Sequence, residues 1–106
     1  MNTIDRSELH TLIAGGGLTL LEALPEQHYR KGHLPGARLF PHDQVRALAP
    51  TVVPDKAARV VVYCASDTCD NSHQAAAELA VLGYGDVRVY VGGKKDWEAA
   101  GLPLER

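Results

Sequence analysis

The apolar run ARVVVYC, residues 58–64, constrains the fold more than any other stretch of this sequence. It is continuous and rich in β-branched valine, which is typical of a central parallel strand buried on both faces. A polar segment follows, and the helical spacing of Ala75, Leu79 and Leu82 then predicts a helix over residues 71–83. Because parallel strands are joined by crossover helices, this order of strand, loop and helix predicts an α/β fold.

The alternation of strand and helix continues through the rest of the chain. Asp5 is placed to cap a first helix, with Glu8 at the capping-box position and three glycines to end it. Asn71 and Gln74 resemble a second capping box. We therefore expect a mostly parallel sheet in one domain, residues 1–106. The further elements are strands at 18–24 and 87–91, a turn over 32–40 that leads into a short strand, a helical turn at 25–32, a helix at 42–50 that ends at Pro50, and a glycine turn into a short helix over 92–101.

The composition limits the partners and the setting. The formal charge is −2 and no basic block occurs, so nothing indicates binding to nucleic acid or to an anionic membrane. No apolar run approaches the ~18 residues of a membrane span, and the first residues are polar. With only two cysteines, the chain is expected to be cytoplasmic, with its thiols mostly reduced.

Cys64 stands at the tip of the central strand, shortly before a helix begins. In open α/β sheets ligands gather at the carboxyl ends of the strands, so residues 64–72, residues 92–95 and the loop after Leu24 should share one rim. Backbone N–H groups of the loop and of the helix start would stabilise a thiolate or an anionic persulfide at this sulfur. The alternative from this pattern alone is a core cysteine that merely ends a strand.

Several motifs resemble those of the rhodanese family of sulfurtransferases, over nearly the whole chain. HYRKGHLPGARLF is similar to the family's Gly-His-x-Pro-Gly-Ala segment, and VVVYC resembles the strand that carries its persulfide-forming cysteine. VRVYVGGKKDW is similar to the family's closing Gly-Gly-x-x-x-Trp signature. The resemblance implies a three-layer domain whose five-stranded, mostly parallel sheet has helices on both faces.

The resemblance also implies a reaction and the residues that perform it. Cys64 would take a sulfane sulfur from thiosulfate, a persulfide or a polysulfide and pass it to cyanide, a thiol or a protein cysteine, with no cofactor and no metal. The donor would bind the loop Ala65, Ser66, Asp67, Thr68, Cys69, Asp70, Asn71 and Ser72, with Cys69, His73, Lys94 and Glu22 as auxiliary residues. The residues leave the natural donor and acceptor, the pathway and the oligomeric state open.

Three departures from the family pattern affect this interpretation. The usual Asp-x-Arg stands here as Glu22-Ala23-Leu24, so its arginine is lost. The loop after Cys64 is roughly two residues longer than the common form, and it carries Asp67 and Asp70 where an arginine is common. Because these carboxylates repel a dianion, we expect poor kinetics with thiosulfate. One of Lys94 and Lys95 could offset the repulsion.

Other interpretations of the two cysteines fit the residues less well or stay open. A tyrosine-phosphatase-like cradle needs an arginine six residues after its cysteine, and here that residue is Asp70. Cys64, Cys69 and His73 would supply too few ligands for a structural zinc site. Cys69 is either a loop thiol without a role or a thiol that attacks a Cys64 persulfide. A non-catalytic module that binds a partner, or senses reactive sulfur or oxidants through Cys64 and Cys69, is the alternative function.

Two residues outside the loop have structural interpretations. His33, in GHLPG, is expected to be buried and to bond backbone across the turn rather than to act as a base. Trp97 is expected to pack the last helix against the sheet. His10, His28 and His42 are expected on the surface.

Overall fold

Five parallel strands form one sheet at the centre of the molecule. In the computed structural model, which describes residues 2–106, the strands stand in the order β1-β5-β4-β2-β3. The central β4 is buried at every position, as its continuous run of valines predicts. The strands are β1 (Asn2–Thr3), β2 (Thr19–Glu22), β3 (Arg38–Leu39), β4 (Val60–Tyr63) and β5 (Val87–Tyr90).

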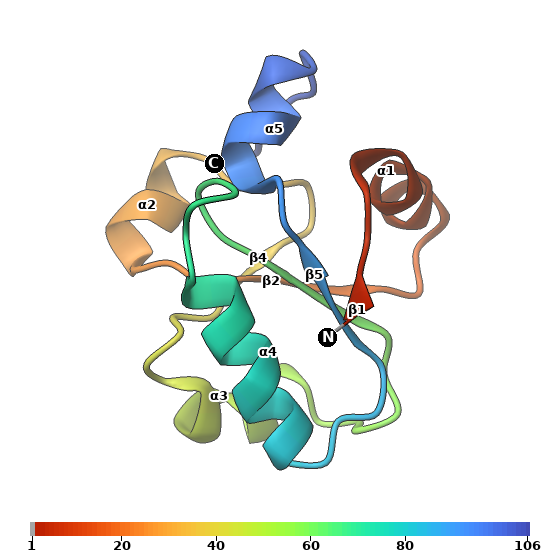
Figure 1. Ribbon diagram of the computed structural model, residues 1–106, viewed down its shortest axis with the longest axis vertical. Helices are drawn as coiled ribbons and strands as arrows, with labels where there is room; N and C mark the ends of the chain where they lie inside the picture. Colours follow the sequence, from red (N-terminus) through yellow and green to blue (C-terminus); the bar gives the residue numbers. More distant parts are fainter. Residues whose placement is uncertain (1) are drawn as a thin grey trace.

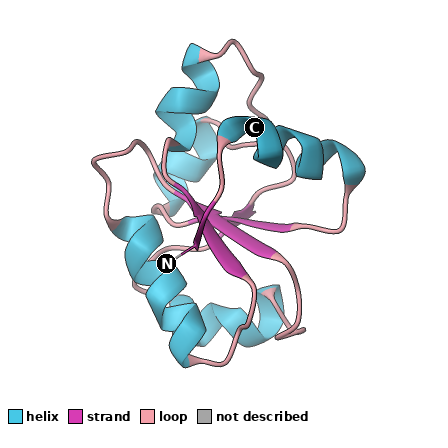
Figure 2. Ribbon diagram, turned by 45° about the vertical axis from the view of Figure 1, so that its right-hand side comes forward, coloured by secondary structure: helices cyan, strands magenta, loops and turns pink. Residues whose placement is uncertain are grey.

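Helices cover both faces of this sheet, as expected (Figures 1 and 2). The helices are α1 (Arg6–Gly15), α2 (Glu26–Lys31), α3 (Val45–Val52), α4 (Asn71–Val81) and α5 (Gly93–Ala99). Helices α1 and α5 lie on one side of the sheet in Figure 1, and α3 and α4 lie on the other. No helix among residues 2–106 is long and apolar enough to cross a membrane.

Alternate residues of the strands point to opposite faces of the sheet and pack in two separate hydrophobic cores. Val60 and Val62 pack with α3 and α4, whereas Val61 and Tyr63 pack with Leu9 of α1 and Trp97 of α5. This division follows from the two-residue period of a strand. Trp97 is 1% exposed and packs its helix to the sheet, as predicted, and its indole N–H donates to the carbonyl oxygen of Pro103 at 2.9 Å.

One predicted cap is right, and one predicted cap and one predicted helix end are wrong. The Asp5 carboxylate accepts a hydrogen bond from the Glu8 N–H at 2.8 Å, so the first cap is confirmed. At α4 the expected Asn71–Gln74 box is wrong, because Asp70 is the cap residue and its carboxylate accepts from the Gln74 side chain. The expected end of α3 at Pro50 is also wrong.

Helix α3 continues past Pro50 to Val52 because its apolar face stays in the core. Pro50 has no N–H to donate, and its ring clashes with the carbonyl group of the residue one turn earlier in the helix. Val52 is partly buried and Val53 is 1% exposed beneath α4, so burial outweighs the loss of one hydrogen bond. The Val53 N–H still donates to the Ala49 carbonyl at 2.8 Å.

Candidate active site

The last residues of three neighbouring strands stand in one row at the carboxyl edge of the sheet. Glu22 of β2 pairs with Tyr63 of β4, and Tyr63 pairs with Tyr90 of β5. Cys64 follows directly after Tyr63 and is 1% exposed. The row therefore holds the candidate nucleophile at the rim that the sequence predicts for it.

The start of α5 fixes the backbone of Cys64. The Lys94 N–H donates to the Cys64 carbonyl at 3.0 Å, and the Lys95 N–H donates to the Ala65 carbonyl at 2.9 Å. Gly93 has a φ of +65°, and a Cβ on it would lie 2.5 Å from the Cys64 carbonyl oxygen. Only glycine fits this approach, so residues 64–66 and 92–95 are brought together as expected.

The sulfur of Cys64 has sulfur and oxygen neighbours. Cys64 and Cys69 are joined as a disulfide with a Cα–Cα distance of 6.3 Å. The Cys69 carbonyl oxygen lies 3.3 Å from Cys64 Sγ, and the Ser72 Oγ lies at 3.4 Å. The structure thus differs from one expectation, because the thiols are paired rather than reduced. The contacts of the sulfur besides the disulfide are with a carbonyl oxygen and a hydroxyl.

A tight turn shapes the loop between the two cysteines. The Cys69 N–H donates to the Ser66 carbonyl at 3.1 Å, and the Ser66 and Thr68 hydroxyls are 3.0 Å apart. This turn folds the chain back so that Cys69 returns to Cys64. It also leaves Ala65, Asp67 and Thr68 exposed on its outer side.

The remaining loop residues lead into α4. Asp70 is exposed, and its carboxylate accepts from the Gln74 side chain at 3.0 Å. Asn71 and His73 are half-buried in the first turn of α4, and Ser72 between them is 2% exposed. Of these residues, Ser72 is the one in contact with the Cys64 sulfur.

Glu22 is fully buried and lies in a polar network rather than against the sulfur. Its Oε1 accepts from the Tyr63 hydroxyl at 2.8 Å and pairs with Lys94 Nζ at 3.0 Å. The Tyr63 oxygen in turn accepts from the Leu34 N–H at 3.0 Å, and Lys94 Nζ donates to the His28 carbonyl at 2.7 Å. Oε2 of Glu22 is buried without a hydrogen-bond partner.

Because of these contacts, the Lys94 ammonium group is already paired within the protein. Its side chain is 13% exposed, because it points inward to Glu22 and α2. Lys95 is exposed instead, so of the two lysines it is the one that an anion in solvent can reach. Burial first, and the Glu22 charge second, raise the pKa of Tyr63 far above its usual range, which keeps this phenol a neutral donor.

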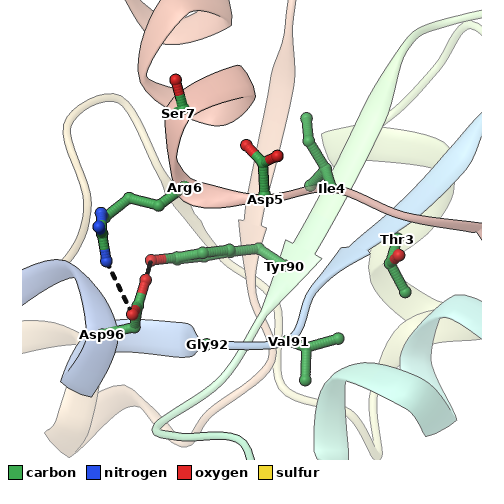
Figure 3. Close-up of a pocket in the computed structure, with 9 residues that line it drawn as sticks. All are labelled: Thr3, Ile4, Asp5, Arg6, Ser7, Tyr90, Val91, Gly92 and Asp96. Carbon is green, nitrogen blue, oxygen red and sulfur yellow. Dashed lines mark hydrogen bonds and ion pairs between the residues drawn. The ribbon is translucent and has the colours of Figure 1, made fainter.

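Two cavities flank the turn that begins α5. The larger, of about 480 Å³, lies between the start of α1 and the end of β5, and Figure 3 shows Tyr90 and Arg6 converging on Asp96 there. The smaller, of about 280 Å³, is lined by Asp67, Gly92, Lys95, Asp96 and Ala99. Asp67 and Lys95 therefore face one cavity beside the loop that joins Cys64 to Cys69.

Tyr90 and Asp96 have no counterpart in the sequence prediction of the site. The Tyr90 hydroxyl donates to Asp96, which also pairs with Arg6 at 2.9 Å. Burial first, and Asp96 second, raise the pKa of Tyr90 above its usual range. The signal that could have found Tyr90 is its position at the carboxyl end of the strand beside β4.

The histidines lie away from the sulfur contacts. His33 is 8% exposed, and its Nδ1 lies 3.0 Å from the Tyr29 carbonyl, which confirms a buried imidazole bonded to backbone. His10 and His28 are exposed, as expected, and His42 is half-buried, so only part of its side chain lies at the surface. Within residues 2–106, no three His, Cys, Asp or Glu side chains are grouped in a way that could hold a metal ion.

A model of the rhodanese-like domain family matches residues 5–100. The chain belongs to this family. The five-stranded sheet with helices on both faces is therefore the rhodanese fold that the motifs indicate.

Solved structures with similar folds include two rhodanese-type proteins. A rhodanese with anions from E. coli is 30% identical and has a TM-score of 0.70, over 84% of this chain and 98% of that chain. A thiosulfate sulfurtransferase from Pseudomonas aeruginosa is 26% identical with a TM-score of 0.88, over 100% of this chain and 20% of that chain. These neighbours relate the chain to the sulfurtransferases of the family.

A curated relative has a different description. The HTH-type transcriptional regulator Rv0324 of Mycobacterium tuberculosis is 28% identical over 104 residues. The match covers 98% of this chain but 45% of that protein. The chain thus spans less than half the length of this relative.

Proposed function

We propose that this rhodanese-like protein is a sulfurtransferase that carries sulfur as a persulfide on Cys64. The observation that carries the proposal is the position of Cys64, at the carboxyl end of the central strand and against the first turn of α4. The family match and the sulfurtransferase neighbours support the same chemistry.

The reaction has two balanced steps. The Cys64 thiolate attacks the sulfane sulfur of the donor, and the donor's remaining part leaves with the electron pair, as sulfite from thiosulfate or as a thiolate from a persulfide. A nucleophilic acceptor, cyanide or a thiol, then attacks the outer sulfur, and Cys64 leaves as the thiolate. The Ser72 hydroxyl is placed to donate to the sulfur in the anionic state that both steps share.

The loop charges favour some donors over others. Asp67 faces the cavity that a donor would enter, and Lys95 lies in the same cavity. Asp70 is turned toward Gln74. We propose that a persulfide or polysulfide is a better donor than the thiosulfate dianion, because Asp67 repels the second charge.

Intact mass tests the proposal directly. The reduced protein is incubated with each donor, separated from it and weighed, beside a Cys64→Ser variant. We expect a gain of one sulfur in a Cys69→Ser protein, in which no second thiol can remove it, lost again on addition of cyanide with formation of thiocyanate, and no gain in Cys64→Ser. A sulfur that remains on the protein in Cys64→Ser would exclude Cys64 as the carrier.

A sensing module is the second candidate, and the Cys64–Cys69 disulfide together with the regulator relative favours it. Such a module would change its thiol state once without catalysing repeated transfer. Thiocyanate formed by Cys69→Ser in large excess over protein supports the enzyme, whereas one equivalent or less supports the sensor.

A further inference from the structure

The two cysteines, Cys64 and Cys69, differ in their exposure to solvent. Cys64 is 1% exposed, whereas Cys69 is half-buried in the polar loop. The turn from Ser66 to Cys69 returns the second thiol to the first, and the two are paired across 6.3 Å between their Cα atoms. That separation lies within the usual range for a disulfide, so the fold admits the bond without moving β4 or α4.

We propose that Cys69 resolves the Cys64 persulfide and that the loop thereby reduces sulfane sulfur to sulfide. The inference rests on the proposed persulfide and adds a second activity to transfer. The Cys69 thiol attacks Sγ of Cys64, the bond from Sγ to the outer sulfur breaks, and the outer sulfur leaves as hydrosulfide with the Cys69 proton. The products are one hydrosulfide and the Cys64–Cys69 disulfide seen in the structure.

The placement of Cys69 selects this outcome over a simple relay. Attack on the outer sulfur would move the persulfide to Cys69 and release no sulfide. The loop instead brings Cys69 into contact with Sγ of Cys64 itself. The carbonyl oxygen of Cys69 also lies 3.3 Å from Sγ of Cys64, so the backbone and the side chain of Cys69 both contact this sulfur.

Reopening the disulfide requires an external dithiol, and the difference in access determines where it attacks. One thiolate of the reductant reaches the half-buried Cys69 sulfur, forms a mixed disulfide there and expels Cys64 as a thiolate. The Ser72 hydroxyl, 3.4 Å from Sγ, stabilises that leaving group. The second thiol of the reductant then frees Cys69, so two electrons from the dithiol pass to the sulfur released as sulfide.

Sulfide release from a loaded protein tests the resolving step. Reduced parent protein and a Cys69→Ser variant are loaded with excess thiosulfate, which brings no thiol, and are then separated from it without an acceptor. We expect one sulfide per chain from the parent, loss of two hydrogens and a linked Cys64–Cys69 peptide. We expect Cys69→Ser, and Cys69→Ala beside it, to keep the added sulfur and release no sulfide.

The outcomes separate this inference from the proposed function. If the parent keeps its persulfide as long as Cys69→Ser does, the resolving role is wrong and sulfur transfer through Cys64 still stands. If none of the three proteins gains sulfur, the proposed function fails, and this inference fails with it. If the parent and Cys69→Ser release sulfide equally, the sulfide does not come from attack by Cys69.

A second measurement tests the direction of reopening. The oxidised parent is treated briefly with glutathione, a monothiol, and is then alkylated and mapped. We expect glutathione on Cys69 and the alkyl group on Cys64. Glutathione on Cys64 would overturn the assignment of Cys69 as the exchange residue.

Discussion

Ser72 is the residue whose hydroxyl meets the Cys64 sulfur, at 3.4 Å inside the protein. A hydrogen bond to a charged group contributes about 1.5–3 kcal/mol, so its loss should slow a reaction of the thiolate by about tenfold or more. We therefore expect Ser72→Ala, in a Cys69→Ser background, to lower the alkylation rate of Cys64 at neutral pH. Thr11→Ala, which removes an exposed hydroxyl on α1, is the control. Equal rates in Ser72→Ala and its parent would show that the hydroxyl does not stabilise the thiolate.

Asp67 and Asp70 carry the same charge but differ in what their side chains face. Asp67 shares a cavity with Lys95, whereas Asp70 is bonded to Gln74. We expect Asp67→Asn to lower the KM for thiosulfate by a few-fold at low salt, Lys95→Met to raise it, and Asp70→Asn to change it little. Steady-state kinetics at two salt concentrations measure this. Equal effects of the two aspartates would contradict the placement of Asp67 at the donor's path.

At the scale of elements, the join between β4 and α5 depends on Gly93. An alanine Cβ there would lie 2.5 Å from the Cys64 carbonyl oxygen and 2.9 Å from the Ala65 carbonyl carbon, at a φ of +65°. The strained backbone alone costs about 1–2 kcal/mol, and the clash adds to it. We expect Gly93→Ala to lower the free energy of unfolding by more than about 2 kcal/mol, measured in urea.

Gly85→Ala is the matched control for that change. An alanine Cβ at residue 85 would meet no heavy atom within 4 Å, and the backbone of Gly85 has no positive φ. Its substitution should leave stability nearly unchanged and sulfur uptake by Cys64 intact. A Gly93→Ala protein as stable as Gly85→Ala would mean that the rim relaxes easily around residue 93.

The buried pair of Glu22 and Lys94 ties β2 to the first turn of α5. Glu22 is fully buried and Lys94 is 13% exposed. Removal of either side chain therefore leaves the other charge unpaired and poorly hydrated. Lys94→Met should therefore destabilise the protein by about 3–5 kcal/mol. The double variant Glu22→Gln/Lys94→Met should be less destabilised than Lys94→Met alone. Urea unfolding of both variants measures the difference, and an additive double variant would contradict the pairing.

Local patterns predict the elements, and long-range contacts determine the rest. The valine run of β4 and the Asp5 cap are local signals, and both are confirmed. The continuation of α3 past Pro50 depends on burial beneath α4, which no local pattern records. The inward turn of Lys94 depends in the same way on Glu22, which lies far from it in the sequence. The motifs placed Cys64 at the rim, but the sulfur's contact with Ser72 required the folded loop.

At the scale of the whole molecule, the row across the carboxyl edge joins the sheet to the elements around it. Tyr63 connects β2 to the segment at Leu34 through Glu22, and Tyr90 connects β5 to α5 through Asp96. Both phenols act as neutral donors beside carboxylates. The integrity of this edge therefore depends on these tyrosines keeping their protons.

That dependence predicts how stability changes at high pH. Burial is the first cause that raises the pKa of Tyr29, Tyr63 and Tyr90 above 10.0, with Glu22 next for the first two and Asp96 for the third. The folded state thus holds protons that the unfolded state loses. The stability from these groups is fully present below about pH 10 and falls as pH rises beyond it, by up to about 1.4 kcal/mol per pH unit for each of Tyr63 and Tyr90, whose pKa values are raised most.

Urea unfolding between about pH 9 and pH 11, followed beside phenolate absorbance, measures this slope. Tyr90→Phe is the informative variant, because Asp96 keeps its partner Arg6 when the phenol is lost. The variant should lose the contribution of one proton to the slope above about pH 10 and leave the slope below it unchanged. If phenolates form in the folded protein at the pKa of free tyrosine and stability does not fall, the contacts at this edge of the sheet do not depend on protonated tyrosines.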